Sequence, residues 1–443
     1  MIERIVKRDG RVVPFDREKI TFAVLQAAIA VGGRDRVKAE KVTDEVIRML
    51  EQRSRPDSIP TVEEVQDLVE KALIERGHAR TAKAYIVYRY EHALKRAGRK
   101  SLTYSPDNIP YEKLWEALSW AVDHRCVYLE QIADSIREGR YQNLVRDCEE
   151  FYDQELARAA GRLEERLESI KMIIIAGPSS SGKTTTTIKI ESRLKPKGLS
   201  FVPINVDNFF LDLDQHPRNS QGDYDFETPQ ALDIPLINET FCKLIEGRKV
   251  TMPFYNFKTG RREGSAGEIE LGEGQILLID SLHGLFPELT EGVPEEQKFR
   301  LYIETLSQIK DQANQFIRWA DIRLLRRMVR DMQFRNYSPA QTIRHWHFVR
   351  RSELRYIVPR LREAEVIVNS FLPFELPVMK NKVGAFFLDF TCEFKEDPEN
   401  ADAYDRALRI QKMFAEVPGW EDEQVVPKDS LLREFIGGSV YSY

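Results

Sequence analysis

An eight-residue stretch, Gly177–Thr184, constrains the fold of this chain more than any other feature. It reads Gly-Pro-Ser-Ser-Ser-Gly-Lys-Thr, which is the phosphate-binding pattern G-x-x-x-x-G-K-[ST]. The apolar, β-branched run Met172–Ala176 before it predicts a buried strand, and Thr185–Leu194 after it predicts a helix. A strand, a small-residue loop and a helix N-terminus form an anion site, because loop amides and the helix dipole face the ligand. The sequence therefore predicts binding of a nucleoside triphosphate.

The loop and the residue after it supply most of the contacts expected for ATP. Lys183 is expected to reach the β- and γ-phosphates, and the Thr184 hydroxyl is expected to hold Mg²⁺. The expected ATP-binding residues of this segment are Gly177, Pro178, Ser179, Ser180, Ser181, Gly182, Lys183, Thr184 and Thr185.

Two later strand-like runs end in a carboxylate. Phe201–Asp207 ends in Asp207, and Gln275–Asp280 ends in Asp280. Residues at the carboxyl ends of parallel strands face the ligand crevice. Transfer of phosphate to a hydroxyl needs a group that orients the nucleophile and accepts its proton, so Asp207 is the expected base. Asp280 is expected to help hold Mg²⁺, with Asp207 as a further ligand; the alternative for both is a helix N-cap.

A third candidate is the arginine-rich helix predicted at Asp321–Arg335. Arginine forks stabilise the negative charge of a transferred phosphate. Beside a phosphate loop, this pattern favours a lid that closes over ATP. A surface or nucleic-acid-binding helix is the alternative.

Composition and charge limit the classes of function. The net charge of −5 gives no bulk argument for binding nucleic acid or an acidic membrane. The four cysteines form no CxxC pair, which argues against a zinc ribbon or a disulfide framework. The first residues lack an apolar signal core, and no window approaches the ~18 apolar residues of a membrane span. We therefore expect a cytoplasmic protein with no membrane partner and no nucleic-acid partner.

Three parts follow one another along the chain. Residues 1–99 form the first, residues 100–169 read as a helical linker region, and residues 170–443 alternate strand-like and helix-like segments. Such alternation with a phosphate loop predicts an α/β fold, a P-loop NTPase-type parallel sheet with flanking helices. The chain is long enough for two or three domains with ordinary cores.

The first part predicts a small, mainly helical domain. Two short strands flank an Asp-Gly turn, Asp16 is the expected N-cap of a helix from Arg17, and Thr61 with Glu64 forms a capping box. Its basic edge is suited to phosphates, but a solvated charged face would have the same composition.

The same part resembles an ATP-cone domain. The likeness rests on Val6-x-Arg8-x-Gly10, Phe15-Asp16-x-x-Lys19-Ile20 and Ala82-x-Ala84-Tyr85-x-x-Tyr88-Arg89. That family is the nucleotide-sensing module of ribonucleotide reductases and of a bacterial repressor of their genes. The resemblance implies regulation by ATP or dATP, with a change of oligomeric state in a homo-oligomer. It implies that the nucleotide contacts are Lys7, Arg8, Arg17 and Lys19.

The third part resembles the uridine kinase and phosphoribulokinase family, with a likeness to a bacterial uridine kinase-like subgroup. Besides the loop, the motifs are Asp207-x-Phe209-Phe210, Tyr224-Asp225-Phe226-Glu227-x-Pro229, Pro253-x-Tyr255-x-Phe257, Arg326-Arg327-x-x-Arg330-Asp331, Gln333-Phe334-Arg335 and Leu431-Leu432-Arg433-Glu434-Phe435-Ile436-Gly437-Gly438.

The family likeness assigns roles to particular residues. Asp207 would be the base, and Lys183, Arg327 and Arg330 would stabilise the transferred phosphate, with Arg335 on the nucleotide. The substrate contacts would be Asp207, Phe210, Glu227, Tyr255, Phe257 and Arg327. The chain departs from pyrimidine nucleoside kinases at Gly260, where they have a base-reading histidine, and at Phe210, where they have tyrosine. A missing hydrogen-bond donor reduces discrimination for that base.

Together these features predict a Mg²⁺-dependent kinase that transfers the γ-phosphoryl group of ATP to a hydroxyl of a nucleoside-like molecule. A kinase acting on a sugar phosphate or another small metabolite is one alternative. A nucleotide-responsive regulatory or assembly protein with little turnover is the other.

Overall fold

The computed structural model describes residues 2, 4–6, 12–29, 31–33, 35–53, 59–78, 81, 82, 84, 85, 109–218, 222, 224–397 and 400–442. The chain divides into two compact units, Met1–Thr103 and Tyr104–Tyr443.

The N-terminal unit combines three described helices with a two-stranded antiparallel sheet. Its elements are β1 (Arg4–Val6), β2 (Val12–Pro14), α1 (Arg17–Ile29), α2 (Arg36–Arg53) and α3 (Val62–Glu75). Thr61 and Glu64 form the reciprocal capping box at the start of α3, and Asp16 Oδ1 accepts from the Glu18 amide at 3.1 Å before α1. Both helix starts lie where the capping residues predict them. The core consists largely of aliphatic side chains from the three helices, among them Val24, Val46, Leu68 and Val69.

The second unit is built on a five-stranded parallel sheet in the order β4-β7-β3-β8-β9. The strands are β3 (Met172–Ala176), β4 (Ser200–Ile204), β7 (Gln275–Ser281), β8 (Lys298–Glu304) and β9 (Val366–Asn369). This sheet, with helices on both faces, confirms the α/β prediction, and the mainly helical N-terminal region is confirmed as well.

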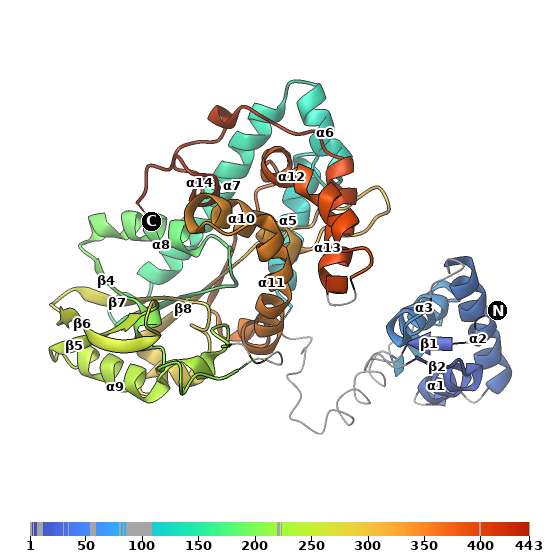
Figure 1. The fold of residues 1–443 in the computed structure, drawn as a ribbon, viewed down its shortest axis with the longest axis horizontal. Helices are drawn as coiled ribbons and strands as arrows, with labels where there is room; N and C mark the ends of the chain where they lie inside the picture. Colours follow the sequence, from blue (N-terminus) through green and yellow to red (C-terminus); the bar gives the residue numbers. More distant parts are fainter. Residues whose placement is uncertain are drawn as a thin grey trace. The chain divides into compact units, whose positions relative to one another are not determined.

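Alternate residues of β3 belong to different cores, as the two-residue period of a strand requires. Ile173 and Ile175 pack in one core with α7 (Tyr141–Glu164) and α8 (Lys183–Leu194). Met172 and Ile174 pack in the other with α9 (Ile234–Ile245). Helices α8 and α9 lie on opposite sides of the sheet (Figure 1). A strand buried on both faces is uniformly apolar, which is why the run before the loop reads Met-Ile-Ile-Ile-Ala.

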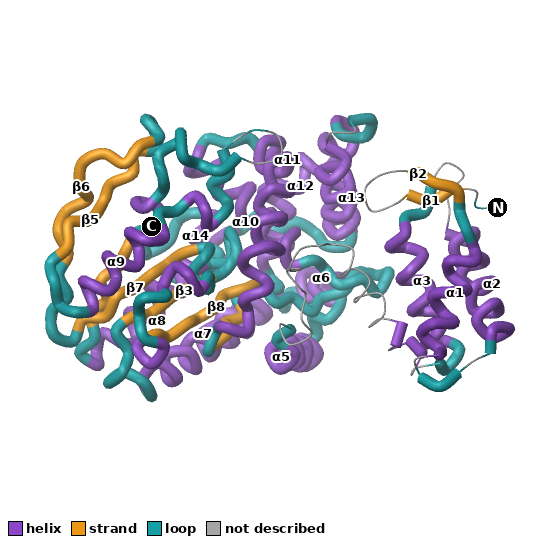
Figure 2. Tube along the Cα trace, turned by 90° about the horizontal axis from the view of Figure 1, so that it is seen from below, coloured by secondary structure: helices purple, strands orange, loops and turns teal. Residues whose placement is uncertain are grey.

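Helices in the range 100–169 share a core with the sheet rather than standing apart from it. These helices are α5 (Tyr111–Asp123), α6 (Leu129–Arg137) and α7. The Tyr152 hydroxyl lies 2.6 Å from Thr186 Oγ1 on α8, and the Tyr141 hydroxyl donates to the Phe374 carbonyl at 2.6 Å. Helix α7 is thus bonded both to α8 and to the segment that follows β9, and it lies beside α8 (Figure 2).

The remaining elements complete this unit. The hairpin β5 (Val250–Asn256) and β6 (Arg261–Ile269) lies beside α9, and the later helices are α10 (Trp319–Arg330), α11 (Pro339–Ser352), α12 (Glu375–Glu393), α13 (Ala401–Ala415) and α14 (Arg433–Ile436). Among the residues that the structure describes, no helix is long and apolar enough to cross a membrane.

Candidate active site

The phosphate loop lies between the end of β3 and the start of α8. Gly182 has φ +91° and is the N-cap of α8, a backbone conformation that favours glycine. A Cβ on Gly177 would lie 2.4 Å from the Ile303 carbonyl oxygen, so the loop approaches the neighbouring strand β8 too closely for a side chain. Gly182, Lys183 and Thr184, at the start of α8, line a cavity.

Lys183 folds back over the loop that it follows. Its Nζ donates to the Gly177 carbonyl at 3.0 Å and to the Pro178 carbonyl at 3.4 Å. Burial lowers the pKa of the ammonium, while Asp280 and Glu434 act in the opposite direction. Lys183 is thus held at the loop as a point charge for a phosphate.

Two arginines of α10 reach the loop from across the cavity. Arg327 Nη1 donates to Ser179 Oγ at 2.9 Å, and Arg330 Nη2 donates to Ser180 Oγ at 3.1 Å. Burial lowers the pKa of Arg330 to about 10, which leaves it protonated at neutral pH. The structure therefore brings together the loop serines and two of the arginines expected to stabilise a phosphoryl group.

The other arginines of α10 anchor the helix. Arg323 bonds Glu353 at 2.5 and 2.9 Å and pairs with Glu304 at 2.8 Å, while Arg326 bonds Glu375 at 2.6 and 2.8 Å. Both arginines are fully buried, as are Ile322, Leu324, Leu325 and Met328 of the same helix. Helix α10 is thus a core helix and not a lid as a whole. Regular α-helix also ends at Arg330, and residues 331–335 form a π-helical turn.

Asp331 holds two arginines that face the cavity, Arg327 and Arg335. It is a site residue that sequence reasoning missed. Its Oδ2 accepts from Arg327 Nε at 2.7 Å and from the Thr342 hydroxyl at 3.2 Å, and its Oδ1 pairs with Arg335 at 3.5 Å. The i, i+4 spacing of Arg327 and Asp331 is the signal that could have identified it.

Asp207 lies in a short 3-10 turn, Val206–Phe209, that follows β4. The strand ends at Ile204, three residues earlier than the sequence pattern indicates, because the Asn205 side chain caps the turn by accepting from the Asp207 amide at 3.0 Å. Asn205 is therefore the capping residue, and the Asp207 carboxylate remains available to the cavity. Burial raises the pKa of the Asp207 carboxyl above its ordinary value, while the charges of Lys183 and Arg335 act to lower it.

Asp280 and Thr184 line the same cavity as Asp207. Burial raises the pKa of Asp280 to about 6, although Lys183 counteracts the shift. The Asp280 carboxylate and the Thr184 hydroxyl are oxygen ligands of the kind that Mg²⁺ uses. No group of three or more acidic, histidine or cysteine side chains forms a metal cluster within the described ranges. Asp280, Asp207 and Thr184 together fit an ion that is held by one or two carboxylates and by substrate phosphates.

The cavity has a volume of about 1330 Å³ and an aromatic wall away from the loop. Phe210, Phe226 and Phe257 line it, with the Phe210 ring 5.4 Å from Phe226 and 5.9 Å from Phe257. His216, which sequence reasoning missed, packs behind this wall with its ring 4.3 Å from Phe226. The wall offers flat apolar faces to a planar or apolar part of a ligand.

One expected substrate contact, Tyr255, and one departure from the pyrimidine kinases, Gly260, bear on this wall. Tyr255 does not line the cavity: its side chain is 2% exposed and supports Phe257 from behind, with ring centres 5.0 Å apart. Gly260 lies in the turn after β5 with φ +68°, and a Cβ there would lie 2.1 Å from Leu213 Cδ1. Position 260, where pyrimidine nucleoside kinases carry histidine, therefore contributes no side chain to this cavity.

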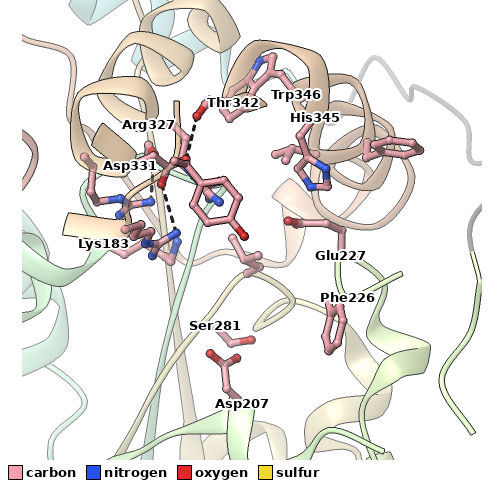
Figure 3. Close-up of a pocket in the computed structure, with 18 of the residues that line it drawn as sticks. Lys183, Asp207, Phe226, Glu227, Ser281, Arg327, Asp331, Thr342, His345 and Trp346 are labelled. Carbon is pink, nitrogen blue, oxygen red and sulfur yellow. Dashed lines mark hydrogen bonds and ion pairs between the residues drawn. The ribbon is translucent and has the colours of Figure 1, made fainter. Parts of the chain in front are cut away.

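Glu227 and two histidines face the middle of the cavity. Burial raises the pKa of Glu227 to about 6, and Arg327 only partly offsets this. His283 also lines the cavity, and burial lowers its pKa to about 4. His345 lies above Glu227 (Figure 3). His283 comes three residues after Asp280 at the end of β7, a spacing that could have marked it.

The expected nucleotide contacts of the N-terminal unit are only partly described. Arg17 and Lys19 are exposed at the start of α1, where Arg17 pairs with Asp44 at 2.7 Å and Lys19 with Asp16 at 3.6 Å. Lys7 and Arg8 lie outside the described residues.

Comparison with known families agrees with this two-part organisation. Residues 3–94 match the ATP cone domain, and residues 172–374 match the Phosphoribulokinase / Uridine kinase family. A uridine kinase of Deinococcus deserti is 28% identical over 198 residues, which is 44% of this chain and 86% of the relative. Uridine-cytidine kinase B of Dictyostelium discoideum is 28% identical over 44% of this chain and 73% of its own length.

Two further comparisons give a relative of another class and a solved structure. A vitamin B12-dependent ribonucleoside-diphosphate reductase of Thermoplasma acidophilum is 30% identical over 38% of this chain and 22% of its own length. The structure of a possible uridine kinase from Bacillus stearothermophilus, 14% identical, covers 47% of this chain and all of that chain with a TM-score of 0.29.

Proposed function

We propose that this chain, which joins an ATP-cone domain to a P-loop domain of the phosphoribulokinase/uridine kinase family, phosphorylates a hydroxyl of a nucleoside-like molecule with ATP. One observation carries the proposal. A carboxylate that is not used as a helix cap, Asp207, opens into the cavity that holds the phosphate loop and Lys183. A protein that only bound nucleotide would have no need of a base at that position.

Each step of the proposed mechanism uses backbone or side-chain groups of the described residues. Loop amides and Lys183 hold the β- and γ-phosphates, while Asp207 orients the acceptor hydroxyl and takes its proton as the phosphoryl group moves in line. Arg327 and Arg330 neutralise the charge that develops on the transferred group. Mg²⁺, held by Thr184, Asp280 and Asp207, would supply further charge neutralisation and orient the phosphate oxygens.

The acceptor would lie between Asp207 and the aromatic wall. Phe210, Phe226 and Phe257 suit the flat face of a base, and Glu227 would accept hydrogen bonds from sugar hydroxyls. We therefore propose a nucleoside-like acceptor without assigning its base, since no histidine at position 260 reads it.

A sugar phosphate or a related anionic metabolite is the second candidate acceptor. The observation that favours it is the presence of Arg335 and Arg344 among the residues that line the cavity. A phosphate or carboxylate on the acceptor would be attracted to these guanidinium groups.

The N-terminal domain is proposed to make turnover respond to ATP and dATP. Support comes from the match of residues 3–94 to the ATP cone domain. We propose that nucleotide binding there acts through the association of chains into a homo-oligomer.

The proposal is tested by ATP consumption with Mg²⁺ against a panel of nucleosides, nucleotides and sugar phosphates, using the full chain and an Asp207→Asn variant. We expect one acceptor class to stimulate ATP consumption, and Asp207→Asn to lower kcat about 10²–10⁴-fold while ATP still binds. Asp214→Asn, an exposed acidic residue seven positions away, is the matched control and should keep full activity. Unchanged turnover in Asp207→Asn would rule out its role as the base. Tight ATP binding without any acceptor would favour a nucleotide-responsive regulatory protein.

A further inference from the structure

Residues 423–438 form a strap that packs against the phosphate loop, and the proposed mechanism does not use it. Its apolar side chains Leu431, Leu432, Phe435 and Ile436 are buried in the core of the second unit. Arg433 closes the strap on itself by donating to four of its carbonyls, those of Glu423, Val426, Pro427 and Gly437. The backbone of the strap is therefore firmly anchored.

The strap places one carboxylate on the start of α8. Glu434 Oε2 accepts from the Thr185 amide at 3.0 Å and from the Thr185 hydroxyl at 2.8 Å. Glu434 Oε1 lies 3.6 Å from Arg330 Nη1, and only 5% of this side chain is exposed. Next to it, Leu431 packs so closely on Gly182 that a Cβ there would lie 2.4 Å from Leu431 Cδ1.

These contacts use groups that a nucleotide needs. The first amides of the helix after a phosphate loop cradle the α- and β-phosphates, and the helix dipole favours negative charge there. In the structure, an oxygen of Glu434 accepts from the Thr185 amide and hydroxyl in the manner of a phosphate oxygen. The same carboxylate also lies beside Arg330, which is needed for the transferred group.

A nucleotide and this carboxylate would compete for the same donors. Bound phosphates would add negative charge next to Glu434, and like charges repel more strongly the closer they lie. Because the strap backbone is anchored on both sides of Glu434, rotation of the side chain is the movement that can vacate Thr185. That rotation would also release Arg330.

We propose that Glu434 is an internal occupant of the phosphate cradle, which nucleotide must displace from Thr185 when it binds. The inference rests on the proposed nucleotide site and adds a residue that sets nucleotide affinity. If Glu434 occupied the cradle in nine molecules of ten, the apparent affinity for nucleotide would be roughly tenfold weaker than that of an empty cradle. The reason is that only molecules in which Glu434 has moved away bind nucleotide.

The test measures MgADP affinity by calorimetry for the full chain, Glu434→Gln and Glu434→Asp. Glutamine removes the charge at nearly constant shape, and aspartate keeps the charge but falls short of Thr185 by one methylene group. Asp429→Asn is the control, because Asp429 lies in the same strap but is 59% exposed and pairs with Lys189 at 3.5 Å.

We expect Glu434→Gln to bind MgADP about tenfold more tightly than the parent chain, Glu434→Asp to bind more tightly by a smaller factor, and Asp429→Asn to bind like the parent. Unchanged or weaker binding in both Glu434 variants would overturn the inference and assign Glu434 to support of the loop. If the Gln variant does not fold, the Asp variant decides alone. Absence of MgADP binding in the parent chain would instead contradict the proposed function.

Discussion

Glu227 is a single carboxylate whose surroundings make its charge sensitive to pH near neutrality. Its pKa is raised from 4.5 to about 6 because burial disfavours the charged form. Between these two values the folded chain binds more protons than the unfolded chain, so the free energy of unfolding falls as pH rises. A shift of this size corresponds to about 2 kcal/mol.

We predict that Glu227→Gln removes this part of the pH dependence. The parent chain should lose about 2 kcal/mol relative to the variant as pH rises from 4.5 to 7. Chemical denaturation of both proteins at several pH values measures the difference, and subtraction cancels other titrating groups. Parallel pH profiles for the two proteins would contradict the raised pKa.

Single residues also show what can be inferred from sequence and what cannot. The loop, its lysine, the cap at Asp16 and the capping box at Thr61 are local patterns, so their geometry follows from neighbouring residues. Tyr255 is expected in the substrate pocket from its family position, but packing against Phe257 places it outside the cavity.

At the scale of elements, α10 carries two sets of arginines with different surroundings. Arg323 and Arg326 are buried with glutamate partners, while Arg327 and Arg330 face the cavity. The sequence shows one basic helix and cannot distinguish the sets, since the partner glutamates come from other elements. The helical pattern of residues 111–164 likewise shows an apolar face but not that the sheet unit covers it.

Asp331 links α10 to α11, and its removal should disturb the cavity without unfolding the chain. We predict that Asp331→Asn lowers kcat at least tenfold, because Arg327 loses a charged hydrogen bond, which contributes about 1.5–3 kcal/mol, and Arg335 loses its ion-pair partner. Steady-state kinetics with the acceptor found in the panel measures the effect, and a larger change in kcat than in KM would mark a positioning role.

The control for this variant is Glu239→Gln, which removes the carboxylate of an exposed i, i+4 ion pair with Lys243 on α9. An exposed pair of this kind contributes about 0.3–0.5 kcal/mol, so its kinetics should match the parent chain. Equal losses in both variants would mean that the effect of Asp331 is not specific to the arginines.

At the scale of the whole molecule, the chain joins an ATP-cone domain to a P-loop domain of the phosphoribulokinase/uridine kinase family. If nucleotide binds the N-terminal domain, replacing Lys7 and Arg8 together by alanine should abolish or alter the response of turnover to ATP and dATP. Basal turnover should remain, because neither residue belongs to the second unit.

Turnover measured across a dATP titration tests this prediction. Arg36→Ala, which removes an exposed arginine of α2 that pairs with Glu18 and Glu40, is the control and should keep the parent response. Identical dATP responses in the Lys7/Arg8 variant and the parent would remove these two residues from the regulatory site.

The bonds between Glu434 and Thr185 also bear on how the chain folds. The two residues are 249 positions apart, so these bonds cannot form until most of the second unit has collapsed around its sheet. Contacts between distant residues slow folding, because the entropy of closing the intervening chain is lost before the contact is gained. We therefore expect the phosphate loop to reach its final geometry late, after a compact intermediate has formed.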